Sequence, residues 1–215
     1  MGQIFILFYF CTLAVSLVYF KKYVDTPLRF FPLLIAYTLF NEALGYFIMS
    51  YEEFTFFEED EYNWHNIIIY NIYQLVFFAY LFWLYHQLIT SSTYKMIISI
   101  GGLLTILAYI FSAFIQDPFH TSLFYADTLG SVLIVLTIVL HFSTMKKLTR
   151  YNLMMWINLG MLIFYVYLPF DVLNAYLNEE FYLENNLRHI LWVLIYIMYG
   201  LFMFGFIISK RSAFR

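Results

Sequence analysis

The sequence predicts an all-α membrane protein in which seven transmembrane helices form one polytopic bundle. The first observation is composition: the 215 residues are 63% apolar and 24% aromatic, and only 12% are charged. A soluble domain usually carries about a quarter charged residues. This chain therefore has too little charge to cover a water-exposed surface. The other two observations are the spacing of the apolar runs and the alternation of charge between them.

Apolar runs long enough to cross about 30 Å of hydrocarbon recur along the whole chain. The segments between them are too short for a separate soluble domain, so we expect residues 1–215 to form a single transmembrane domain. The first run lacks a basic start and a small-residue cleavage site, and it is interpreted as a span and not as a signal peptide. The predicted helices lie near residues 3–20, 30–50, 65–89, 96–115, 121–143, 153–177 and 187–208.

The basic residues predict the orientation of these helices. With the N-terminus outside, ten of the eleven Lys and Arg residues fall in cytoplasmic segments, and Arg188 is the exception. Ten of the fourteen Asp and Glu residues then fall in the outer loops. Because cytoplasmic loops carry an excess of Lys and Arg, we expect the C-terminus to be cytoplasmic.

Three carboxylates lie inside the predicted spans at similar depths. At a rise of 1.5 Å per residue, Glu42, Asp127 and Asp171 are about 12, 9 and 10 Å below the outer boundary. Amide, guanidinium and imidazole side chains from two further helices fall in the same half of the membrane: Asn71, Gln74, Arg188 and His189. The sequence therefore predicts one polar layer in the outer leaflet, to which five helices contribute.

Within each helix, the polar residues share one face at about 100° per residue. Charge that faces lipid costs several kcal/mol, so we expect these faces to point into the bundle and to enclose a binding pocket. Pro169 should also kink the sixth helix near this layer. The candidate pocket residues are Asn41, Glu42, Tyr70, Asn71, Gln74, Asp127, Asp171, Asn174, Arg188 and His189, with Arg188 as the candidate counter-ion.

An alternative is that these side chains only form interhelical hydrogen bonds, worth about 1 kcal/mol each. Motifs for catalysis are missing. The last predicted span has no lysine for a retinal Schiff base, and no GxGD-type protease motif occurs. His65, His120 and His189 lack the i,i+4 partner of a zinc site, so we predict no metal, cofactor or catalytic residue. His86 and His141 are interpreted as interfacial residues.

Three stretches suggest a family: "LFYFCTLAVSLVYFKKYVDTPLRFFPLLIAYTLFNEALGYF", "YNIYQLVFFAYLF", and "DTLGSVLIVL" followed by "MMWINLGMLIFY". Their order resembles a group of small seven-helix inner-membrane proteins of one Gram-negative phylum. The resemblance is carried by Glu42, Tyr70, Asn71, Gly130, Ser131, Trp156 and Gly160. In size and aromatic content the chain also resembles the membrane accessory protein of type VI-B CRISPR loci. That resemblance implies modulation of a cytoplasmic RNA-guided antiviral nuclease.

These patterns favour a non-enzymatic accessory or regulatory membrane protein. It would sense a small ligand or ion at the outer pocket, or modulate a cytoplasmic protein partner through its basic inner face. The candidate partner-binding residues are Lys21, Lys22, Lys146, Lys147 and Arg150. The alternatives are a proton- or cation-coupled transporter or channel, and an intramembrane lipid hydrolase. The basic residues are too few and scattered for a nucleic-acid surface, so we expect only the bilayer, a ligand and a protein as partners.

Overall fold

The computed structural model describes residues 2–51, 66–145 and 149–210. Within these ranges every regular element is a helix and no strand occurs, as the sequence predicts. The long helices are α1 (Gly2–Val18), α2 (Phe31–Ser50), α3 (Asn66–Leu88), α4 (Ser92–Ile115), α5 (Phe124–Thr144), α6 (Leu153–Leu177) and α8 (Leu187–Ile208). The short ones are two 3-10 turns, η1 (Phe20–Lys22) and η2 (Pro27–Phe30), and α7 (Glu179–Glu184).

Six of these helices are long and apolar enough to cross a membrane, which supports a multi-pass membrane protein. They are α2 together with η2, α3, α4, α5, α6 and α8. The first predicted span is also an apolar helix, but it is shorter. With 17 residues, α1 extends over about 26 Å, somewhat less than the hydrocarbon thickness of about 30 Å.

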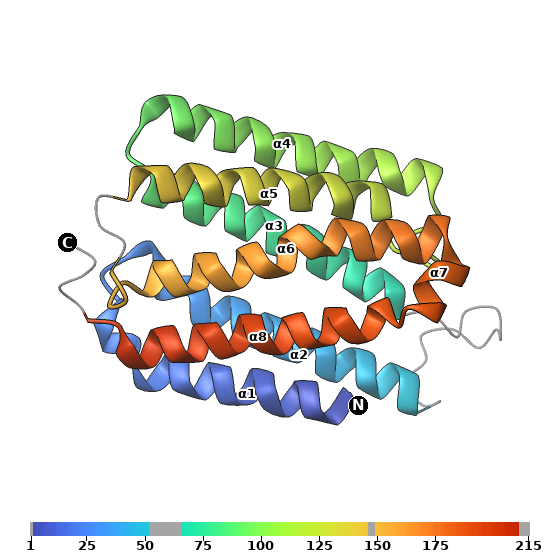
Figure 1. The fold of residues 1–215 in the computed structure, drawn as a ribbon, viewed down its shortest axis with the longest axis horizontal. Coiled ribbons are helices and arrows are strands. Elements are labelled where there is room, and N and C mark those ends of the chain that lie inside the picture. Colours follow the sequence, from blue (N-terminus) through green and yellow to red (C-terminus); the bar gives the residue numbers. More distant parts are fainter. Residues whose placement is uncertain (1, 52–65, 146–148, 211–215) are drawn as a thin grey trace.

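The long helices run antiparallel, and neighbours in sequence pack side by side (Figure 1). The first and last helices also pack together, because α8 contacts α1 as well as α6. In addition, α3 contacts α5 as well as α2 and α4. Buried side chains from all seven long helices form one core cluster, in which Phe78, Tyr165 and Phe202 are almost completely buried. The core is therefore continuous along the bundle.

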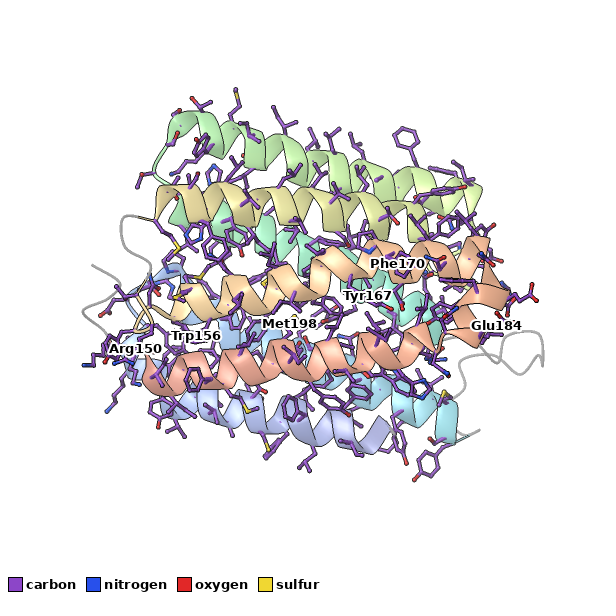
Figure 2. The ribbon with its side chains drawn as sticks, viewed as in Figure 1. Arg150, Trp156, Tyr167, Phe170, Glu184 and Met198 are labelled. Atoms are coloured by element: carbon purple, nitrogen blue, oxygen red, sulfur yellow. The ribbon has the colours of Figure 1, made fainter. Side chains whose placement is uncertain are left out.

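The two ends of the bundle differ in charge. One end, called the basic end below, carries Lys21, Lys22, Arg29, Lys95, Arg150 and Lys210. The opposite end, called the acidic end, carries Asp117, Glu179, Glu180 and Glu184, and it also holds Arg188. Arg150 and Glu184 are labelled at these opposite ends in Figure 2. The charge separation that the sequence predicts is thus present among the described residues.

Polar side chains fix several helix ends. The Ser91 hydroxyl accepts a hydrogen bond from the Tyr94 N–H at 3.5 Å, so α4 begins four residues before the apolar run predicted from residue 96. The Asn152 side chain caps α6 by accepting from the Met154 N–H at 3.0 Å. At the basic end, the Lys22 ammonium group donates to the carbonyl of Ile207 at 2.7 Å. This cation at the C-terminus of α8 also complements the helix dipole.

The chain between α6 and α8 sets the position of Arg188. Helix α6 is continuous through Pro169, and its ribbon bends partway along its length (Figure 1). It is followed by α7, which the sequence did not predict. Asn186 then adopts a left-handed conformation, with φ of 51°, that asparagine tolerates better than most residues. This reversal starts α8 and places Arg188 in its first turn.

Candidate functional site

Two neighbouring cavities lie at the acidic end of the bundle. The first, called the α2 cavity, has a volume of about 550 Å³ and is lined by residues of α1, α2, α3, α7 and α8. The second, called the α6 cavity, has a volume of about 580 Å³ and is lined by residues of α3, α5, α6, α7, α8 and the segment before α5. Tyr70, Tyr182, Arg188 and Leu191 line both. Volumes of this size are typical of small-molecule sites.

Most of the predicted pocket residues are brought together here. The α2 cavity is lined by Glu42, the α6 cavity by Asn71, Gln74, Asp127 and Asp171, and both cavities by Tyr70 and Arg188. The three carboxylates predicted at similar depths therefore face two adjoining cavities. They do not form one tight cluster.

Asp171 is the least satisfied of the three carboxylates. Its side chain is only 4% exposed and lines the wall of the α6 cavity. Its Oδ1 atom is buried and makes no hydrogen bond to any described part of the chain. Removing a carboxylate from water without a hydrogen-bond partner is unfavourable. The stability of the fold therefore does not explain the presence of this side chain.

Asp127, in contrast, has a partner within the protein. The Tyr109 hydroxyl of α4 donates a hydrogen bond to Asp127 Oδ1 at the start of α5. The segment before α5 is fixed by Asn71, which donates to the carbonyls of Pro118 at 2.8 Å and Thr121 at 3.1 Å. Asn71 Oδ1 also accepts from the backbone N–H of the residue preceding α5 at 3.1 Å. Asn71 thus lies on the cavity wall, but its polar atoms position the start of α5.

Glu42 is held by a tyrosine that fits against a glycine. The Tyr70 hydroxyl donates to Glu42 Oε2 at 3.2 Å. One turn further along α2, a Cβ atom on Gly45 would lie 2.8 Å from that hydroxyl oxygen. A side chain at position 45 would therefore displace Tyr70, so Gly45 is part of the site although it contributes no polar group.

Arg188 lies on the wall that the two cavities share. Its guanidinium carbon is 5.5 Å from the centre of the Trp192 ring, one turn along α8. In the ranges that the structure describes, it forms no ion pair with a carboxylate. A cation in the first turn of a helix also opposes the helix dipole. The predicted counter-ion is therefore at the site, but it is not paired with an acid.

Tyr182 of α7 belongs to the site and was missed from the sequence. It lines both cavities and is half-buried. Burial and the nearby Asp171 carboxylate raise the pKa of Tyr182, and Arg188 lowers it in part. Its hydroxyl is therefore neutral near pH 7 and can donate or accept a hydrogen bond. No periodic pattern in "EEFYLE" indicated a helix that would carry this residue to the cavities.

Three predicted pocket residues do not line either cavity. The Asn41 amide donates to the carbonyl of Tyr37 at 2.8 Å, one turn back in the same helix. The Asn174 amide likewise donates to the carbonyl of Phe170 at 2.7 Å, and the residue is half-buried. His189 is exposed and contacts Trp192, with ring centroids 4.8 Å apart.

The predicted partner-binding residues at the basic end have different environments. Lys21 is exposed, whereas Lys22 is used to cap α8. Arg150 is exposed and donates to the Tyr151 hydroxyl at 3.1 Å. This hydrogen bond and the positive charges of Arg150 and Lys210 lower the pKa of Tyr151. Lys146 and Lys147 lie outside the described residues.

A second buried polar cluster, called the Asn158 network, lies toward the basic end. The Tyr85 hydroxyl donates to Asn158 Oδ1 at 2.9 Å, and Asn158 Nδ2 lies 2.8 Å from His141 Nδ1. Tyr85 and Asn158 are fully buried, and His141 is 6% exposed. The sequence suggested that His141 is interfacial. This prediction was wrong, because the residue is buried between helices. Its partner Asn158 lies near the basic end of α6 and was not among the predicted polar residues.

Within the described residues, no three His, Cys, Asp or Glu side chains are close enough to hold a metal ion together. Comparisons with protein-family models, curated proteins and solved structures found no match. The chemistry of the site therefore has to be inferred from its own geometry. It offers two cavities with both apolar and polar walls, Glu42 in one and Asp127 and Asp171 in the other. On the shared wall lies a guanidinium that forms no ion pair within the described residues.

Proposed function

We propose that the protein is a non-enzymatic membrane sensor that binds a small polar ligand in the α2 and α6 cavities. The observation that carries this proposal is the Asp171 carboxylate, which is buried at a cavity wall and has an oxygen without a partner in the described chain. A bound ligand that donates a hydrogen bond would supply the missing partner. The ligand would then stabilise the occupied form over the empty one.

In this proposal the protein spans the bacterial inner membrane seven times, with the N-terminus outside and the C-terminus in the cytoplasm. The basic end then faces the cytoplasm, in agreement with the excess of Lys and Arg in cytoplasmic segments. The short helix α1 counts as the seventh span, because a bilayer can thin locally around a short hydrophobic segment. The cavities consequently open toward the outer face.

A purely structural role explains the polar layer less well. Interhelical hydrogen bonds require that the polar groups contact one another, as Tyr109 and Asp127 do. Asp171 and Arg188 have no such contact within the described residues. Occupancy of the cavities would be read at the basic end, where Lys21 and Arg150 are exposed to a cytoplasmic partner.

The test is to identify what the protein retains during purification. Wild type, Asp171→Asn and Glu184→Gln are purified from membranes in mild detergent, and the small molecules released on denaturation are identified by mass spectrometry. Glu184 is an exposed acid of α7 that lines neither cavity, so its variant is the matched control.

We expect a compound that copurifies with wild type and with Glu184→Gln but is depleted roughly tenfold or more in Asp171→Asn. Loss of one hydrogen bond to a charged group costs about 1.5–3 kcal/mol, and 1.4 kcal/mol is about a tenfold change in affinity. If all three proteins released the same compounds in the same amounts, a ligand site at Asp171 would be ruled out.

A further inference from the structure

Two groups of opposite charge line the α6 cavity, and no ion pair joins either of them to another group of the described chain. The Asp171 carboxylate is 4% exposed, and its Oδ1 atom has no hydrogen bond. The Arg188 guanidinium lines the same cavity and forms no ion pair among the residues that the structure describes. The two groups come from different helices, α6 and α8, which pack against each other along the bundle.

Arg188 has a contact that positions it, and no ion pair in the described part of the chain neutralises it. It lies over the Trp192 ring, which leaves its N–H groups available because stacking on an aromatic face does not use them. Its place in the first turn of α8 adds the positive end of the helix dipole to its own charge. A planar guanidinium binds carboxylate and phosphate groups through two parallel hydrogen bonds. This wall of the cavity is therefore suited to an anionic group.

Asp171 requires a different group. A carboxylate oxygen only accepts hydrogen bonds, so its partner must carry N–H or O–H donors. A primary ammonium group has three such donors and also compensates the charge, whereas a quaternary ammonium group has none. The wall of the α6 cavity combines hydroxyl and amide side chains with apolar ones, among them Leu168, Val172 and Leu191.

We propose that the ligand is a zwitterion whose primary ammonium group binds Asp171 and whose carboxylate or phosphate group binds Arg188. This inference rests on the proposed ligand-binding function and names its chemical class. A simple cation would satisfy Asp171 but would bring a second positive charge beside Arg188. A simple anion would enter a site that already holds Asp127 and Asp171. A zwitterion pairs both charges and adds no net charge to the site.

Such a zwitterion has two possible sources. It is either a free molecule, such as an amino acid or a glycerophosphoethanolamine, or the headgroup of phosphatidylethanolamine in the surrounding bilayer. Both present an ammonium group a few bonds from an acidic group. The neutral hydroxyl of Tyr182, between the two cavities, is available to either of them as a further hydrogen-bond partner.

The experiment uses the full-length chain, purified in an uncharged detergent and stripped of lipid. Its thermal unfolding midpoint is measured against increasing concentrations of five probes. Glycerophosphoethanolamine and glycine are zwitterions with a primary ammonium group, and glycerophosphocholine is a zwitterion with a quaternary one. Ethanolamine carries only the cation and glycerol 3-phosphate carries only the anion. Native mass spectrometry after reconstitution then compares retention of phosphatidylethanolamine with that of phosphatidylcholine.

We expect at least one zwitterion with a primary ammonium group to bind roughly tenfold or more tightly than either singly charged probe and than glycerophosphocholine. Binding of a soluble zwitterion identifies a free molecule as the source. Selective retention of phosphatidylethanolamine alone identifies the lipid headgroup. In either case Asp171→Asn and Arg188→Gln should each weaken binding roughly tenfold or more, and Glu184→Gln should not. The unfolding midpoint of each variant without probe confirms that it is folded.

Two results would overturn the inference, and they differ in what they say about the proposed function. In the first, ethanolamine binds as tightly as the zwitterions, and its affinity falls in Asp171→Asn but not in Arg188→Gln. The cavity would then be a ligand site for a simple cation. In the second, no zwitterion binds either in detergent or in the bilayer, which would exclude a zwitterion as the ligand. The proposed function would then fail as well only if no copurifying compound depended on Asp171.

Discussion

The two halves of the bundle treat their buried polar groups in opposite ways. Toward the basic end, Asn158 is fully buried and bonds to both Tyr85 and His141. Toward the acidic end, Asp171 is almost as deeply buried and lines a cavity of about 580 Å³, but its Oδ1 atom has no partner among the described residues. The two residues lie on the same helix, α6, so the difference is not one of element type.

The comparison distinguishes two kinds of buried polar group. Those of the Asn158 network hydrogen-bond to one another, whereas the Asp171 carboxylate has an oxygen without a hydrogen bond in the described chain. A buried network whose members satisfy one another stabilises and orients its helices. A buried carboxylate without a partner is unfavourable in the empty protein and is characteristic of a site where function, not stability, determines the residue. Replacing a buried polar residue should therefore lower the free energy of unfolding at Asn158 but not at Asp171.

The largest effect should come from the Asn158 network. Replacing Asn158 with leucine leaves the Tyr85 hydroxyl and one nitrogen of His141 buried without their partner. Each unsatisfied buried group costs about 1–3 kcal/mol, so we expect the free energy of unfolding to fall by roughly 2–4 kcal/mol. Reversible unfolding in detergent micelles measures this change.

A matched control is the double variant Asn158→Leu, Tyr85→Phe, which removes the stranded hydroxyl together with its partner. It should recover part of the lost stability. If the single variant were as stable as wild type, the Asn158 network would not be the structural element described above.

A smaller effect should follow from Gly45→Ala at the α2 cavity. The new methyl group would lie 2.8 Å from the Tyr70 hydroxyl, so the ring must move and its hydrogen bond to Glu42 is lost. A hydrogen bond of this kind contributes about 1 kcal/mol, and we expect a loss of unfolding free energy of that order.

Gly200→Ala in α8 is the control for this change. Nothing lies within 4 Å of a Cβ atom at position 200, so the added methyl group should cost no stability. Equal losses in the two variants would mean that the contact between Gly45 and Tyr70 has no special role.

The smallest effect is expected at the exposed basic end. Arg150 and Lys210 lower the pKa of Tyr151 below its ordinary value of 10.0. The folded state therefore favours the phenolate, a preference that stabilises the fold only at high pH and is lost as the pH falls through this pKa. Arg150→Gln should raise the pKa of Tyr151 and leave stability at pH 7 unchanged.

The difference in absorbance at 295 nm between wild type and Tyr151→Phe, followed from pH 7 to pH 12, reports this single residue among the tyrosines. The same difference measured in the Arg150→Gln background should appear at higher pH. An unchanged titration would show that Arg150 does not contact Tyr151 in solution.

The arrangement of the helices could be predicted largely from the sequence. Apolar runs longer than a membrane is thick have few alternative structures, and each predicted range contains a helix. The ends were less predictable, because they depend on single capping side chains such as Ser91 and Lys22. Helix α7 is too short to show any periodicity.

The site was predicted in outline and not in detail. The depths of Glu42, Asp127 and Asp171 follow from helical rise alone, and all three line the cavities. Rotation about the helix axis is less certain, and Asn174 illustrates this: it lies three residues after Asp171, yet it lines neither cavity and bonds to its own helix. Contacts between helices, such as that of Tyr109 with Asp127, carry no signal in one sequence.

The most direct test of the distinction between the two halves is the free energy of unfolding of Asp171→Asn in protein stripped of ligand and lipid. Because Asp171 Oδ1 has no hydrogen-bond partner among the described residues, we predict that the variant is as stable as wild type or more stable, by up to about 1 kcal/mol. A loss of roughly 2–4 kcal/mol, as expected for Asn158→Leu, would contradict this prediction. It would show that Asp171 is a structural partner within the fold and that its carboxylate is not kept for ligand binding.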